Sequence, residues 1–287
     1  MIKAPLQKTL LFFIILSGLA LSSCARRPKI LLDQVLAGPQ HHLDAGEYRE
    51  AIVAYDDAFR KYPAMEGLLP DYIDSLEKIM QMADRAYQTK KYSEAEKIYL
   101  LLLDSFPLFE DFRMALSFSS ETLNERIKDC RLEAGRIQAR RALQAGGFSR
   151  ALASMKSVVE LYPADPESRA SLAQIGLDIH RRAADAMTGE DYITAGKAFF
   201  ALQQNIELLE KLGPAPPFTR LSLEEGINAC RVHLIKKGLE QYRKGNLAEA
   251  IGIWEGLLAF DPTNVEIQKA VQTATEQLKK IKKEATL

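Results

Sequence analysis

The fold is decided by the stretch Gly46-Glu47-Tyr48-Arg49-Glu50-Ala51-Ile52-Val53-Ala54-Tyr55, which is followed by Tyr62-Pro63. A turn residue comes first, then an aromatic residue or leucine, an alanine three positions later, and a large apolar residue four positions after that. The same pattern returns at residues 92–99, 147–155, 191–199 and 245–254. One match alone would carry little weight, but five matches to one pattern identify a chain with internal repeats.

This set of segments resembles the tetratricopeptide repeat, in which a small residue lets two antiparallel helices approach closely and a proline ends the second helix. The resemblance implies an all-α fold, a right-handed α-solenoid of about five helical hairpins with long leading helices and a C-terminal capping helix. Two departures are visible: the fourth segment lacks the closing proline, and Pro39 should shorten or displace the first leading helix. The solenoid is expected over residues 31–287, with hairpins near 33–63, 71–107, 120–163, 166–212 and 222–262 and a terminal helix at 264–284.

The repeat has an unusual period. The alanine landmarks fall at positions 51, 95, 151, 195 and 250, so the steps alternate between 44 and about 55 residues. A shift of 100 overlays Tyr62-Pro63 on Tyr162-Pro163 and Cys130-Arg131 on Cys230-Arg231. The unit is therefore a module of two hairpins, repeated about two and a half times. Because several helices then separate Cys130 from Cys230, we expect two buried thiols and no disulfide, which needs Cα atoms within about 7 Å.

Local signals predict where several helices begin. Asp165-Pro166 is typical of an N-cap followed by proline at the first helical position, and the helix should run to about Met187. Capping-box spacing predicts further starts at Thr122 and Ser222. The last helix should cover the final repeat with one apolar stripe, made of Ile267, Val271, Ala274, Leu278 and Ile281.

The N-terminus has the layout of a secretory signal peptide. Lys3 and Lys8 precede the apolar run from Leu10 to Leu21, which is shorter than the roughly 20 residues that a membrane span needs. The ending Leu21-Ser22-Ser23-Cys24 resembles the bacterial lipobox. This resemblance implies a signal peptide at residues 1–23, lipidation of the Cys24 thiol, and a short tether at 24–30. The alternatives are an uncleaved anchor and an ordinary cleaved signal. Ala25 after the cysteine favours the outer membrane over the inner one.

Composition limits the function. Ala, Leu, Glu, Lys, Arg and Gln dominate, as in an α-helical protein, and the chain after the signal has 36 basic and 38 acidic side chains. This balance does not favour nucleic-acid binding, which usually calls for a basic patch. His41-His42, His180 and His233 lack further ligands at metal-binding spacing, and no Gly-rich phosphate loop follows a strand. We therefore expect no enzyme, cofactor or metal site.

Function is then expected on the concave face, which the resemblance places on the leading helices. Arg136 and Arg140 lie four residues apart on one helix face, which allows them to present two guanidinium forks to a carboxylate or phosphate; the alternative is an exposed polar face with no dedicated partner. The leading hypothesis is a lipid-anchored scaffold of the bacterial envelope, most consistent with the outer membrane facing the periplasm, that binds a protein partner. The alternative is a ligand-binding accessory lipoprotein of a solute transport system. The positions expected to bind a partner are Asp84, Tyr87, Arg136, Arg140, His180, Tyr242 and Arg243.

Overall fold

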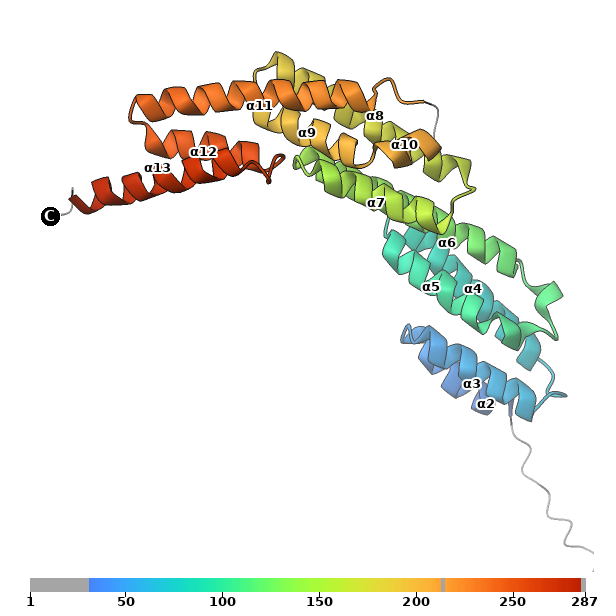
Figure 1. The fold of residues 1–287 in the computed structure, drawn as a ribbon. Coiled ribbons are helices and arrows are strands. Elements are labelled where there is room, and N and C mark those ends of the chain that lie inside the picture. Colours follow the sequence, from blue (N-terminus) through green and yellow to red (C-terminus); the bar gives the residue numbers. More distant parts are fainter. Residues whose placement is uncertain (1–30, 213–214, 285–287) are drawn as a thin grey trace, which may run out of the picture. The chain divides into compact units, whose positions relative to one another are not determined.

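The computed structural model describes residues 31–212 and 215–284, which form an all-α helical solenoid (Figure 1). Twelve α-helices and two short 3-10 helices make up these ranges, with no strand between them. No helix within them is both long and apolar enough to cross a bilayer. The predicted signal peptide at 1–23, the lipidation site Cys24 and the tether at 24–30 lie outside the described residues.

The described chain divides into two compact units, and the first comprises residues 31–81 and 104–119. It contains the paired helices α2 (Leu32–Asp44) and α3 (Tyr48–Lys61), most of α4 (Leu68–Gln88), and the 3-10 helices η1 (Phe106–Phe109) and η2 (Arg113–Ala115). The expected effect of Pro39 is seen in part: α2 has 13 residues, against 21 in α4, but the helix continues through the proline.

Aromatic side chains form the core of the first unit. The rings of Tyr55 and Tyr72 stack 5.2 Å apart, and the Tyr55 hydroxyl donates a 2.7 Å hydrogen bond to Asp71. Phe109 and Phe112 reach the same tyrosine, Tyr72, with centroids at 6.1 and 5.1 Å. The segment that follows α5 is therefore anchored by aromatic packing rather than by backbone pairing.

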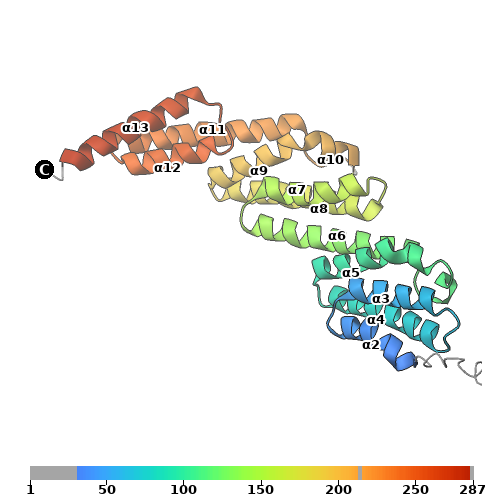
Figure 2. The same cartoon turned by 90° about the horizontal axis from the view of Figure 1, so that it is seen from below.

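The second unit comprises residues 82–103 and the described residues after 119. After α5 (Tyr92–Ser105), which both units share, three long helices each pack against a shorter one, in the pairs α6–α7, α8–α9 and α11–α12 (Figure 2). Helix α13 covers α12. Bounds in this unit are α6 Ser120–Gln144, α7 Phe148–Leu161, α8 Pro166–Thr188, α9 Tyr192–Gln204, α10 Ile206–Leu212, α11 Arg220–Arg243, α12 Leu247–Leu258 and α13 Val265–Glu284.

The hundred-residue period is visible in the packing of this unit. Cys130 and Cys230 are each the eleventh residue of their helix, α6 or α11, and both thiols are fully buried and free, as predicted. Burial raises the pKa of Cys130 to about 12 and that of Cys230 to about 11. The next residue repeats a contact as well: Arg131 donates to the Tyr162 hydroxyl at 3.0 Å, and Arg231 donates to Asp261 at 2.6 Å.

The helix starts were predicted with mixed success. The Asp165 prediction is confirmed, because its carboxylate accepts a 2.8 Å hydrogen bond from the Ser168 amide and α8 runs to Thr188. The start at Ser222 is wrong: Thr219 caps α11, and Ser222 is the N3 residue of that capping box, the third residue of the helix. The start at Thr122 is also wrong, since α6 begins at Ser120. In both cases a cap-like residue lies inside the first turn.

Two features near the C-terminus complete the fold. Where the fourth repeat lacks its proline, α9 ends at Gln204 and the short helix α10 packs back against α8 and α9. The predicted apolar stripe of α13 is buried at Ile267 and Ala274, half-buried at Val271 and Leu278, and exposed at Ile281. The stripe therefore covers the last repeat only over the first part of the helix.

Candidate functional site

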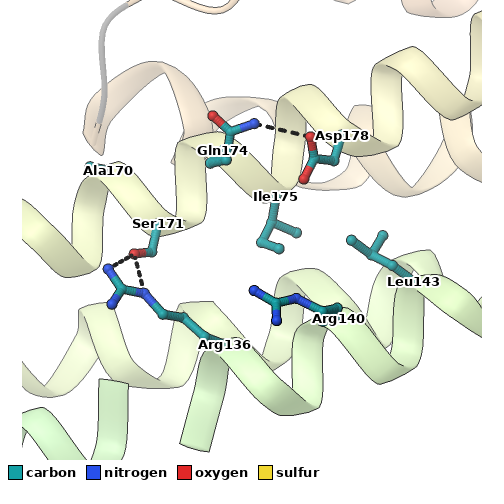
Figure 3. Close-up of a pocket in the computed structure, with 8 residues that line it drawn as sticks. All are labelled: Arg136, Arg140, Leu143, Ala170, Ser171, Gln174, Ile175 and Asp178. Atoms are coloured by element: carbon teal, nitrogen blue, oxygen red, sulfur yellow. Dashed lines mark hydrogen bonds between the residues drawn. The ribbon is translucent and has the colours of Figure 1, made fainter. Parts of the chain in front are cut away.

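A cleft of about 420 Å³ lies between α6 and α8 in the second unit (Figure 3). Helical spacing builds both walls, because side chains three, four and seven residues apart share one face of a helix. The α6 wall is lined by Arg136, Arg140 and Leu143, and the α8 wall by Ala170, Ser171, Gln174, Ile175 and Asp178. Both helices are leading helices of their hairpins, so the cleft lies on the kind of surface where function was expected.

Arg136 is held by side chains of the protein itself. Its guanidinium contacts Glu133 at 2.5 Å and Glu167 at 2.8 Å. Its Nε and Nη2 atoms also donate to the Ser171 hydroxyl at 3.0 and 2.8 Å. Two carboxylates therefore already neutralise this cation, and its donors bind α6 to α8.

Arg140 is the available cation of the cleft. The side chain is exposed and has no hydrogen bond or ion pair with any residue that the structure describes. Figure 3 shows its guanidinium over the cleft, near Ile175, while Arg136 points at Ser171. On the α8 wall, Asp178 accepts a 3.0 Å hydrogen bond from Gln174. The site thus combines one free guanidinium, one carboxylate and an apolar surface formed by Leu143 and Ile175.

Asp84 and Tyr87 were expected on the binding face of the second repeat. Both side chains instead make contacts within the protein. The Tyr99 hydroxyl donates a 2.6 Å hydrogen bond to Asp84, and the Tyr87 ring packs edge-on against the Tyr92 ring with centroids 5.2 Å apart. Burial, together with the bond to Asp84, raises the pKa of Tyr99. Burial also raises the pKa of Tyr87. These contacts join α4 to α5.

The remaining expected residues lie apart from the cleft. His180 stacks on Phe218 with ring centroids 4.9 Å apart, and burial lowers its pKa. Tyr242 donates to the Gln277 side chain at 2.9 Å, and Arg243 is exposed near the end of α11. Of the seven expected positions, the α6–α8 cleft therefore contains only Arg136 and Arg140.

Sequence reasoning missed the α8 wall. Ser171, Ile175 and Asp178 lie nine, five and two residues before His180, which places them on roughly the opposite face of α8, so helical spacing from His180 does not lead to them. The sequence could have indicated this wall through the polar residues of the next leading helix, α8, which lies beside the arginines of α6. No group of three or more His, Cys, Asp or Glu side chains suited to a metal occurs within 31–212 and 215–284.

Comparison with known proteins identifies part of this region. Residues 138–196 match the family described as Tetratricopeptide repeat, a range that includes Arg140 and the whole α8 wall. No curated protein and no solved structure matches the chain. Tetratricopeptide repeats suggest a role in protein–protein interaction, and proteins that contain them are generally non-enzymatic scaffolds. The chain is thus an all-α protein that contains the tetratricopeptide repeat.

Proposed function

We propose that this protein is a lipid-anchored scaffold of the bacterial cell envelope and that it binds a protein partner in the α6–α8 cleft. The observation that carries the proposal is the unpaired guanidinium of Arg140 beside the apolar side chains of Leu143 and Ile175. A cation in reach of an apolar surface suits a partner segment with a carboxylate next to a hydrophobic side chain. The volume, about 420 Å³, lies in the range of sites that bind small ligands or a few side chains.

The test of partner binding uses the difference between the two arginines. Arg140→Glu reverses the only unpaired charge on the α6 wall, so partner capture should fall by about tenfold or more, the size of effect that loss of a charge-assisted contact produces. A photo-crosslinking residue in place of Gln174 captures the partner in intact cells, and mass spectrometry measures its yield. Arg136 is a poor target, because its replacement also breaks the contacts to Glu133 and Glu167.

The matched control for Arg140→Glu is Arg141→Glu. This arginine is exposed on the same helix and does not line the cleft, so its reversal changes the net charge equally and should leave capture unchanged. Equal capture by the parent chain and the Arg140 variant would remove the cleft from the proposal. An equal loss with both variants would point to overall charge instead.

The anchoring part of the proposal rests on the sequence Leu21-Ser22-Ser23-Cys24. Acyl chains on Cys24 would hold the solenoid at the membrane, facing the periplasm from the outer membrane, with residues 25–30 as the tether. Cys24→Ser removes the thiol that accepts the lipid, so the protein should leave the membrane fraction and lose labelling by a radioactive fatty acid. Unchanged fractionation of the serine variant would contradict lipidation at this residue.

A further inference from the structure

An exposed row of apolar side chains, called the stripe below, follows the solvent-exposed face of α11. Leu221, Val232 and Leu239 are 66, 64 and 40% exposed. They are separated by 11 and 7 residues, which is nearly three and two helical turns, so they lie on one line along the helix. The opposite face is buried through Leu223, Ile227, Cys230, Leu234 and Gly238. Three large exposed apolar side chains in one row on a helix offer apolar contact points to a second helix.

Charged side chains lie on the same line. Glu225 follows Leu221 by four residues, and Lys236 follows Val232 by four. Both side chains are exposed, and neither has a hydrogen bond or an ion pair with the described part of the chain. The stripe therefore has a free acid in its N-terminal half and a free base in its C-terminal half.

The stripe of one copy is complementary to the stripe of a second copy that runs in the opposite direction. In an antiparallel pair of α11 helices with a two-fold axis near residue 230, residues at equal distance on either side of 230 face each other. Leu221 then faces the partner's Leu239, nine residues away on each side. Glu225 faces the partner's Lys236, at five and six residues, and Asn228 faces the partner's Val232. We propose that a second copy of this chain occupies the stripe in this antiparallel arrangement.

Charge decides the direction of the pair. A parallel pair in register would place Lys236 against Lys236 and Glu225 against Glu225, and like charges across a helix interface are unfavourable. The antiparallel pair forms the Glu225–Lys236 contact twice and the Leu221–Leu239 contact twice, while each Val232 meets the partner's Asn228. The stripe spans 18 residues, or about 27 Å of helix. A contact of this length buries an area at the low end of specific interfaces, so the dimer is a weak one.

The test is a charge exchange in the full chain. Asn228→Cys places a thiol near the proposed two-fold axis, and a short bis-maleimide reagent in intact cells then links two copies; the chain without this change gives the background. In that setting, Lys236→Glu alone and Glu225→Lys alone should each lower the cross-linked dimer by about tenfold, since each creates two repulsive contacts. The double exchange should restore the dimer. Co-production of the two single variants should give a mixed dimer.

Glu224→Lys is the matched control, because Glu224 is exposed beside the stripe but does not lie on its line. This variant should cross-link as the parent does. Absence of cross-linking above background in the parent would overturn the proposal. An unchanged yield of cross-linked dimer with both Lys236→Glu and Glu225→Lys would overturn it as well. Binding of phosphatidylglycerol vesicles through Leu239 and Lys236 by a chain that stays monomeric would also overturn it, and would assign the stripe to a membrane.

Discussion

Tyr72→Ala should lower the free energy of unfolding of the first unit by about 3–5 kcal/mol. The side chain is fully buried, stacked on Tyr55, and in contact with Phe109 and Phe112. Truncation to alanine removes the ring at the centre of this cluster and leaves a cavity that the surrounding rings fill only in part. Urea denaturation followed by far-UV circular dichroism measures the loss.

Tyr72→Phe is the control for this prediction. The Tyr72 hydroxyl donates to the Ile52 carbonyl at 3.5 Å, a long hydrogen bond, so its removal should cost about 1 kcal/mol or less. The phenylalanine keeps the ring and its packing. If the alanine variant were as stable as the phenylalanine variant, the aromatic cluster would not be what holds residues 104–119 against α3 and α4.

Gly238→Ala should lower the free energy of unfolding of the second unit by about 1–3 kcal/mol. A Cβ atom at Gly238 would overlap the Trp254 indole, coming within 2.6 Å of its Cδ1 and closer still to Nε1. Trp254 is 1% exposed, so a shift of the ring would have to displace the side chains buried around it. Elsewhere in a helix, alanine is favoured over glycine by up to about 1 kcal/mol, and this gain only partly offsets the overlap.

Gly252→Ala isolates that helix preference. Gly252 lies in α12, and a Cβ atom there would meet no atom within 4 Å. The substitution should therefore raise the free energy of unfolding by about 0.5–1 kcal/mol. Urea denaturation of the two variants side by side should give shifts of opposite sign. A higher free energy of unfolding for both variants would show that the close approach of α11 to Trp254 carries no energetic penalty.

Much of the fold was accessible from the sequence, because it depends on local and periodic features. The alanine at each repeat position is buried against a neighbouring helix, with Ala51, Ala95, Ala151, Ala195 and Ala250 all at 0% exposure. Asp165 caps its helix as expected, since a cap involves residues only three positions apart. The errors at Thr122 and Ser222 have the same local origin: two polar residues within one turn compete for the cap, and spacing alone does not choose between them.

The candidate site was predicted less completely, because it depends on contacts between helices. Arg136 and Arg140 do share one face of α6, as their spacing indicated. Only the packing of α8 against the same region brings Glu167 and Ser171 to Arg136, which takes that guanidinium out of use and leaves Arg140 free. Asp84 is engaged in the same way, because it accepts a hydrogen bond from the hydroxyl of Tyr99 on α5.

The sequence by itself therefore determined that the chain is a helical solenoid with a module of about one hundred residues, and that Cys130 and Cys230 are equivalent buried positions. The spacing of repeated residues along the chain is sufficient for these statements, since equivalent residues recur about one hundred positions apart. Only the tertiary structure decided which charged side chains are free. The ion pairs between helices, such as Arg136–Glu167 and Arg231–Asp261, join residues about 30 positions apart, and their distances are set by how neighbouring helices pack.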